Sequence, residues 1–196
     1  PYGSYTAPVS PGSGGGAGDN TVNVSARGGG AVRIQATDVV TVNGRLLANG
    51  GTGTSNHGGG GSGGGIMIEC RVFAGTNGVI SAAGGYGSAS IGGSGGGGRI
   101  AVLYSPADQS NAPLPSVQFS VAPGNASSGG NYLGDPGTLY FPDCQFLSRT
   151  NIVSYSGQWM APGERLDYDN LMVSNVWLRF SAEGFHLNVT NGLTLF

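Results

Sequence analysis

The sequence contains no lysine, and all eight of its basic residues are arginine. Schiff-base chemistry and a phosphate-binding P-loop are therefore excluded, because both need a lysine amine. Charged residues make up only 9% of the chain, and the net charge of −2 does not fit the basic surface of a nucleic-acid-binding domain. No apolar run approaches the roughly 20 residues that a membrane-spanning helix needs. We expect no nucleic-acid partner and no membrane insertion.

Helical periodicity and the common catalytic and metal-binding motifs are missing as well. There is no HExxH, no CxxC, no Cys/His cluster with zinc spacing and no GxSxG between a strand and a helix. Matches to GxGxxG in the glycine runs lack the strand–turn–helix context of a dinucleotide site. We expect no cofactor, no metal centre and no catalytic residue, and we predict that the protein is not an enzyme.

The chain has only two cysteines, Cys70 and Cys144, which stand far apart in the sequence. Sequence alone does not tell whether two cysteines come within the short Cα distance that a disulfide requires. Two alternatives stay open, a disulfide between them or two buried free thiols.

Glycine is the residue that the chain has in excess, at 40 of 196 positions. Ordering a glycine tract costs more conformational entropy than ordering other sequences, so an ordered tract needs a reason for its missing side chains. We expect extended segments similar to polyproline II, which have no internal hydrogen bonds and would bond laterally to one another. The alternative is a mobile surface loop like a Gly/Ser linker. The apolar strands between the tracts favour ordered packing.

Two consecutive stretches, residues 28–51 and 63–85, share one order of features. Each runs from Gly-Gly-Gly through an apolar strand and an Asn-Gly turn to a second strand and Gly-Gly. The copies keep nearly one offset throughout, since Asn43 corresponds to Asn77 and Gly50 to Gly84. A truncated third copy begins at Gly95 and ends in RIAVLY. Self-similarity at a fixed period of this size is typical of repeat architectures.

The Asn-Gly turns, Asn43-Gly44 and Asn77-Gly78, have two interpretations. Asn-Gly between apolar strands signals a two-residue hairpin, but it also supplies left-handed backbone for a corner in a coiled sheet. The repeat favours the corner. A further similarity, VSNVWLRF at 173–180 with VTNGLTLF at 189–196, predicts that these two stretches are successive turns of such a sheet.

Asp167 and Asp169 are the strongest candidates for a chemical site. They lie two positions apart in LDYDNL, so both carboxylates would point to the same side of a strand. Paired carboxylates of this kind bind Ca²⁺ or carbohydrate, or cleave glycosidic bonds, with Arg165 as the neighbouring cation. A solvated strand edge is the alternative that we favour.

Three sites match the N-glycosylation acceptor pattern Asn-X-Ser/Thr: Asn23, Asn125 and Asn188. We expect Asn125 to be the best placed of the three, because its surroundings have the composition of a loop.

The pattern GGG-AVRIQA…NG-RLLANGG, then GGG-IMIEC…NG-VISAAGG and GGGGRIAVLYS, resembles glycine-rich parallel β-helix repeat proteins of bacterial surfaces, of the autotransporter and haemagglutinin-like kind. The resemblance covers roughly residues 28–104. It implies a right-handed coiled sheet, an extracellular location at the cell surface and a structural or adhesive role. In composition alone, the glycine tracts are also similar to glycine-rich receptor ectodomains and phage tail-tip adhesins, in which packed glycine helices form a rigid recognition platform.

The expected fold is therefore all-β, a right-handed parallel β-helix or similar solenoid with ordered glycine-rich excursions. We divide the chain into four regions. They are an N-terminal segment with one strand at 1–27, a glycine-rich repeat region at 28–105, a loop-rich connection at 106–165 and further strands at 166–196 that continue beyond the chain.

The leading functional hypothesis is an extracellular structural or adhesive module of a large surface or filament-forming protein. Open strand edges need a partner, so we expect self-association or contact with neighbouring domains of the same long chain. One alternative is a carbohydrate-binding or polysaccharide-cleaving β-helix module, with a glycan as partner. Another is a receptor-like or phage-like recognition tip.

Overall fold

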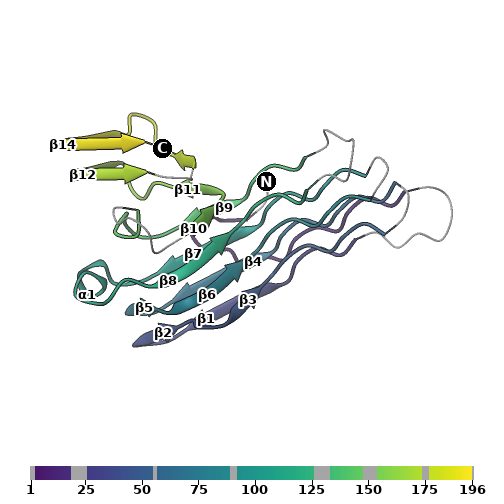
Figure 1. Cartoon of the computed structure of the whole chain (residues 1–196), viewed down its shortest axis with the longest axis horizontal. Helices are drawn as coiled ribbons and strands as arrows, with labels where there is room; N and C mark the ends of the chain where they lie inside the picture. Colours follow the sequence, from purple (N-terminus) through teal and green to yellow (C-terminus); the bar gives the residue numbers. More distant parts are fainter. Residues whose placement is uncertain are drawn as a thin grey trace.

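The computed structural model describes residues 3–18, 26–54, 57–88, 92–125, 133–147, 154–173 and 177–195 (Figure 1). Within these residues the chain forms fourteen strands and one helical turn, so the all-β prediction is confirmed. The elements are β1 (Ala31–Gln35), β2 (Val39–Thr41), β3 (Arg45–Leu47), β4 (Gly65–Glu69), β5 (Val72–Ala74), β6 (Thr76–Ser81), β7 (Arg99–Leu103), α1 (Pro106–Gln109), β8 (Ser116–Ser120), β9 (Thr138–Tyr140), β10 (Ser154–Ser156), β11 (Gln158–Met160), β12 (Arg165–Val173), β13 (Trp177–Arg179) and β14 (His186–Leu195).

Every pairing between these strands is parallel. A six-stranded sheet has the order β1-β4-β7-β9-β11-β13, and a four-stranded sheet has the order β10-β8-β6-β3. Two smaller sheets pair β2 with β5 and β12 with β14. Consecutive strands of the chain mostly enter different sheets, so each repeat unit places one strand beside the corresponding strand of the unit before it.

The register gives the length of one unit. Ile66 of β4 lies opposite Val32 of β1 and opposite Ile100 of β7. The number of residues from Val32 to Ile66 is the same as that from Ile66 to Ile100 and as that from Asn43 to Asn77. This confirms the period expected from the sequence. The step becomes longer between β7 and β9 and then much shorter between β9 and β11. Strands β8 to β11, which lie in the region 106–165, continue the two large sheets of the repeat region.

The prediction that 173–180 and 189–196 are successive turns was wrong. It would place Val173 beside Val189, but Val173 lies opposite Leu195, and Val189 lies opposite Tyr168 of β12. The similar residues of the two stretches do not lie side by side, because β13, near the end of the first stretch, pairs with β11 in another sheet. The register of paired strands is set by which face is buried, and not by identical residues in the two strands.

Neither Asn-Gly pair is the turn of a hairpin. Asn43-Gly44 lies between β2 and β3, which belong to different sheets, and the side-chain Oδ1 of Asn43 accepts a 2.8 Å hydrogen bond from the backbone N–H of Thr76 in the next unit. Asn77 has φ 56° and sits beside a register shift at the start of β6, where the sheet bends. None of the strands that the structure describes forms an antiparallel hairpin, so the hairpin interpretation of these two pairs is wrong.

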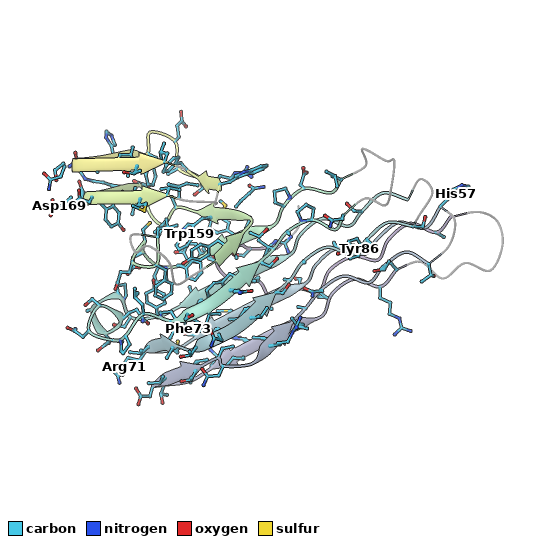
Figure 2. The ribbon with its side chains drawn as sticks, in the orientation of Figure 1. His57, Arg71, Phe73, Tyr86, Trp159 and Asp169 are labelled. Carbon is cyan, nitrogen blue, oxygen red and sulfur yellow. The ribbon has the colours of Figure 1, made fainter. Side chains whose placement is uncertain are left out.

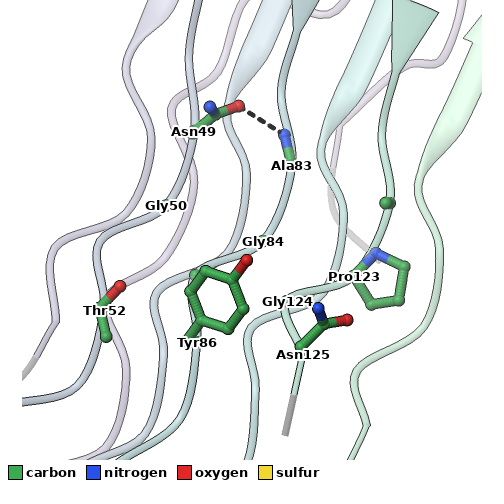
Figure 3. Close-up of a pocket in the computed structure, with 11 residues that line it drawn as sticks. Asn49, Gly50, Thr52, Ala83, Gly84, Tyr86, Pro123, Gly124 and Asn125 are labelled. Atoms are coloured by element: carbon green, nitrogen blue, oxygen red, sulfur yellow. Dashed lines mark hydrogen bonds between the residues drawn. The ribbon is translucent and has the colours of Figure 1, made fainter.

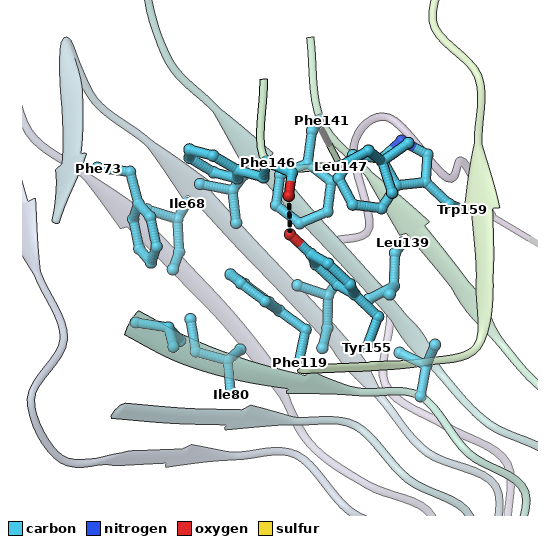
Figure 4. Close-up of a cluster of buried hydrophobic side chains, with 14 of the residues drawn as sticks. Ile68, Phe73, Ile80, Phe119, Leu139, Phe141, Phe146, Leu147, Tyr155 and Trp159 are labelled. Carbon is cyan, nitrogen blue, oxygen red and sulfur yellow. Dashed lines mark hydrogen bonds between the residues drawn. The ribbon is translucent and has the colours of Figure 1, made fainter. Parts of the chain in front are cut away.

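The core lies between the sheets and is rich in aromatic rings (Figure 4). Alternate residues of β4 and β7 point into it, because side chains along a strand alternate between its two faces. Phe119 packs edge-on against Phe141 at 5.1 Å between ring centroids, and Trp159 lies 4.4 Å from Phe141. Among the aromatic residues after position 130, Phe141, Tyr155 and Trp159 are buried and Trp177 is 68% exposed.

The N-terminal residues 3–10 cross the outer face of the six-stranded sheet (Figure 1). The backbone of Pro8 lies against Gly65 of β4, and the ring of Tyr5 contacts that of Tyr140 on β9, with 5.6 Å between centroids. This crossing covers part of the outward face of the sheet.

Candidate functional site

Beyond the sheets, the glycine tracts run side by side as extended segments without strand pairing of the usual kind (Figure 1). We call this part of the protein the glycine bundle. It consists of residues 10–16, 26–30, 48–54, 57–65, 82–88, 92–98, 121–125 and 133–137, joined by lateral backbone hydrogen bonds. The expected ordered packing of the tracts is confirmed.

The segment 57–65 shows how the bundle is bonded. Its successive N–H groups donate in turn to three different neighbouring segments, and the cycle repeats at every third position. The donors and acceptors, at 2.8–2.9 Å, are Gly59 to Gly16, Gly60 to Gly93, Gly61 to Gly51, Ser62 to Ser13, Gly63 to Gly96 and Gly64 to Ala48. A period of three is that of the polyproline II helix, which leaves every backbone group free to bond sideways. The bundle is therefore a lattice, in which each inner segment bonds to several others.

Close packing explains why the residues are glycine. Gly30, Gly64, Gly98 and Gly137 occupy the same place in successive units, directly before a strand of the six-stranded sheet. A Cβ on Gly64 would overlap the carbonyl oxygen of Gly30, and those on Gly98 and Gly137 would meet the preceding unit in the same way. A Cβ on Gly30 would meet nothing within 4 Å, because the structure describes no strand before β1.

Some of the side chains in the bundle line a groove on its surface. This groove of about 310 Å³ runs over the segments 48–54, 82–88 and 121–125 (Figure 3). Its lining residues are Asn49, Gly50, Thr52, Ala83, Gly84, Gly85, Tyr86, Ala122, Pro123, Gly124 and Asn125, none of them charged. Tyr86 is 52% exposed and presents its ring in the middle of the groove. The groove thus presents aromatic and amide side chains above a backbone made largely of glycine.

Asn49 is held in place at one end of the groove. Its Oδ1 accepts hydrogen bonds from the hydroxyl of Ser81 at 2.7 Å and from the backbone N–H of Ala83 at 2.8 Å. Because both donors come from the next unit, the amide is oriented by the stacking itself. The Nδ2 group is then left on the side opposite these two bonds.

The acidic candidates lie on β12, towards the opposite end of the long axis from Tyr86 (Figure 2). Both guanidinium contacts of Arg165 reach the carboxylate of Asp167 at 2.6 Å. These hydrogen bonds lower the pKa of Asp167 and raise that of Arg165, and both side chains are more than half exposed. A glycosidic general acid needs a raised pKa, so Asp167 is unsuited to that role.

Asp169 is also engaged with the neighbouring strand. Its Oδ1 accepts a 2.8 Å hydrogen bond from the hydroxyl of Thr190, and Asn188 donates to Asp167 at 3.2 Å. Among the residues described, no group of three or more His, Cys, Asp or Glu side chains is placed to hold a metal ion. The polar residues of β12 and β14 thus form a ladder of cross-strand bonds on an exposed face.

The three glycosylation candidates have different surroundings. Asn125 is exposed and lines the groove, whereas the side chain of Asn188 is bonded to Asp167 on the β12–β14 pair. Asn23 lies outside the residues that the structure describes.

Cys70 and Cys144 are not joined in a disulfide, and both are buried in the aromatic core. Burial raises the pKa of each thiol to about 11. Since the thiolate is the reactive form, both cysteines are protected from nucleophilic chemistry at neutral pH.

Sequence reasoning missed the groove. Its three central side chains, Thr52, Tyr86 and Asn125, come from three successive units, and the ladders of β3, β6 and β8 put them in one row. The period of the repeat was enough to predict that Thr52 lies beside Tyr86. Asn125 could not be found in this way, because more residues separate β8 from β6 than separate β6 from β3.

Comparisons with known proteins find no relative for this chain: no protein-family model, no curated protein and no solved structure matches it significantly. In the part of the chain that the structure describes, no helix has the length and apolar character needed to cross a membrane.

Proposed function

We propose that the chain is a non-enzymatic structural and adhesive module of an extracellular surface or filament-forming protein. In this proposal its units are the turns of a right-handed parallel β-helix, and the glycine bundle stiffens one side of it. The observation that carries the proposal is the continuity of the backbone bonding. Parallel ladders join each unit to the next in the sheets, and lateral bonds join the same units in the bundle.

Two further points support the β-helical arrangement. Parallel neighbours need crossover connections, and crossovers between parallel strands of one sheet are almost always right-handed. The corner at Asn43-Gly44 moves the chain from one sheet to the next within a unit, as a coiled sheet requires. The bacterial-surface proteins that the sequence resembles are built in this way, and their location is the reason for proposing an extracellular one.

The open ends of the sheets support self-association. On their outer sides β1, β2 and β3 have no partner strand among the residues described, and neither have β10 and β13 at the other end. Natural proteins protect such edges with charged residues, lysine above all, yet this chain has no lysine. Gly30 is glycine although nothing described lies near its missing Cβ. A further unit stacked on β1, from a second copy or a neighbouring domain, would make that glycine necessary.

Lysines on the open edge are expected to abolish this association. The test variant carries Ala31→Lys and Gln35→Lys, both at exposed positions of β1. Sedimentation equilibrium of the unaltered protein at high concentration is expected to give species heavier than the 19.5 kDa monomer. The lysine variant is expected to remain monomeric, because like charges on an edge repel a second strand.

The matched control carries the same added charge away from the edge, at Val9 and at Gln118 of the inner strand β8. It is expected to associate as the unaltered protein does. Monomers alone in the unaltered protein at every concentration, with electron micrographs free of end-to-end particles, would contradict the self-associating part of the proposal.

A further inference from the structure

We infer that the groove over the glycine bundle is a binding site for a neutral saccharide chain. This deepens the adhesive part of the proposed function, on which it rests, by naming a site and the chemical class of its ligand. Three features of the groove suit such a ligand: its uncharged lining, its exposed tyrosine ring and the regular spacing of its side chains.

The lining matches the groups that a neutral sugar offers. The amide of Asn125 and the hydroxyl of Thr52 can donate to and accept from sugar hydroxyls. Asn49, whose Oδ1 already accepts from Ser81 and Ala83, can add a donor through its Nδ2 group. The absence of Arg, Asp and Glu from the described lining argues against a phosphorylated or acidic ligand, which would need charged partners. The groove therefore selects for polar ligands without charge.

Tyr86 supplies the apolar half of sugar recognition. Its ring is 52% exposed and, as Figure 3 shows, stands open between the segment of Thr52 and the segment of Asn125. A tyrosine side chain has only two χ angles, so it loses little conformational entropy when a ligand packs on it. The axial C–H groups of a pyranose ring form a surface of the right shape for this contact.

The repeat puts these groups at regular intervals. Thr52, Tyr86 and Asn125 lie in one row on three hydrogen-bonded segments that continue strands β3, β6 and β8, and neighbouring strands of a sheet are about 4.8 Å apart. That interval is close to the length of one sugar unit in an extended chain. A saccharide lying across the segments would meet a hydroxyl, a ring and an amide at successive units.

The floor brings the ligand close to the backbone. Gly50, Gly84 and Gly124 lie between the side chains, and each is packed against a neighbouring segment on its inner side. Because the lattice of lateral bonds holds these segments, the site is formed before a ligand arrives. A preformed site avoids most of the ordering cost that weakens loop-based recognition.

The experiment measures binding of four neutral hexasaccharides, cellohexaose, chitohexaose, mannohexaose and maltohexaose, by isothermal titration calorimetry. The protein is produced in a bacterial host that does not glycosylate Asn125. At least one hexasaccharide is expected to bind with a Kd below about 1 mM, in the range of modest ligand affinities. Tyr86→Ala is expected to weaken that binding about tenfold or more by removing the stacking surface.

Trp177→Ala is the matched control, since it removes another exposed aromatic ring, on β13 and outside the groove. It is expected to bind the hexasaccharide as the unaltered protein does. Decaproline is included as a probe for peptide binding. No measurable binding of any hexasaccharide, equal binding by Tyr86→Ala, or binding of decaproline alone would overturn the inference. None of these results would affect the sedimentation test of the structural role.

Discussion

Replacing Gly64 by alanine is expected to destabilise the protein by about 3 kcal/mol or more, at the upper end of the cost of overpacking. The added methyl group would overlap the carbonyl oxygen of Gly30, which accepts a hydrogen bond from the N–H of Gly65. Backbone atoms in a bonded lattice cannot move aside as a flexible side chain can. Separating these segments would also break lateral bonds on either side. Urea denaturation followed by Trp fluorescence measures the change in the free energy of unfolding.

Gly30→Ala is the matched control, because Gly30 and Gly64 occupy the same place in consecutive units. With nothing within 4 Å of its missing Cβ, alanine at this position is expected to be neutral or to stabilise by about 0.5 kcal/mol, by restricting the unfolded chain. The comparison is made at a protein concentration where only monomers are present. Equal losses in the two variants would mean that glycine is needed for its flexibility and not for close packing.

Gln109→Leu is expected to cost about 3 kcal/mol, because it leaves two buried backbone groups without partners. The side chain of Gln109 is 1% exposed, and it accepts from the N–H of Phe73 at 2.8 Å and donates to the carbonyl of Phe73 at 3.1 Å. The side chain of Gln109 thus occupies the place of a third strand beside β5, and the β2–β5 sheet ends there. Leucine fits the volume but forms neither bond.

Gln118→Leu serves as the control for the change of residue type. Gln118 is exposed on β8, so its replacement is expected to change the free energy of unfolding by no more than about 0.5 kcal/mol. Thermal unfolding of both variants measures the difference. If Gln109→Leu were as stable as Gln118→Leu, water or a local rearrangement would supply hydrogen bonds to the backbone of Phe73. The stabilising role assigned to Gln109 would then be wrong.

The parts of the fold that the sequence predicted follow from the repeat. The Asn-Gly pairs at 43 and 77 share one spacing with the glycine runs, and that spacing is the register of the parallel ladders. The glycine content itself indicated close lateral packing, since few other arrangements need the missing Cβ. These inferences depend on local composition and on one period, and both are visible in a single sequence.

The rest depends on contacts between distant parts of the chain. Nothing in Pro106–Gln109 indicates that its last side chain will end a sheet, because the role of Gln109 exists only once β5 lies beside it. The row of Thr52, Tyr86 and Asn125 forms across three units of unequal length. Asp167 looked like a candidate for chemistry, but its neighbour Arg165 occupies its carboxylate.

The glycine bundle and the groove on it both depend on the hydrogen-bonded lattice of the glycine tracts. Amide hydrogen exchange, followed by NMR at residues 59–65, tests it most directly, because every N–H from Gly59 to Gly65 donates to a backbone carbonyl in another segment. These amides are expected to exchange far more slowly than those of a synthetic peptide with the sequence of residues 58–65. Exchange as fast as in the free peptide would contradict the lattice.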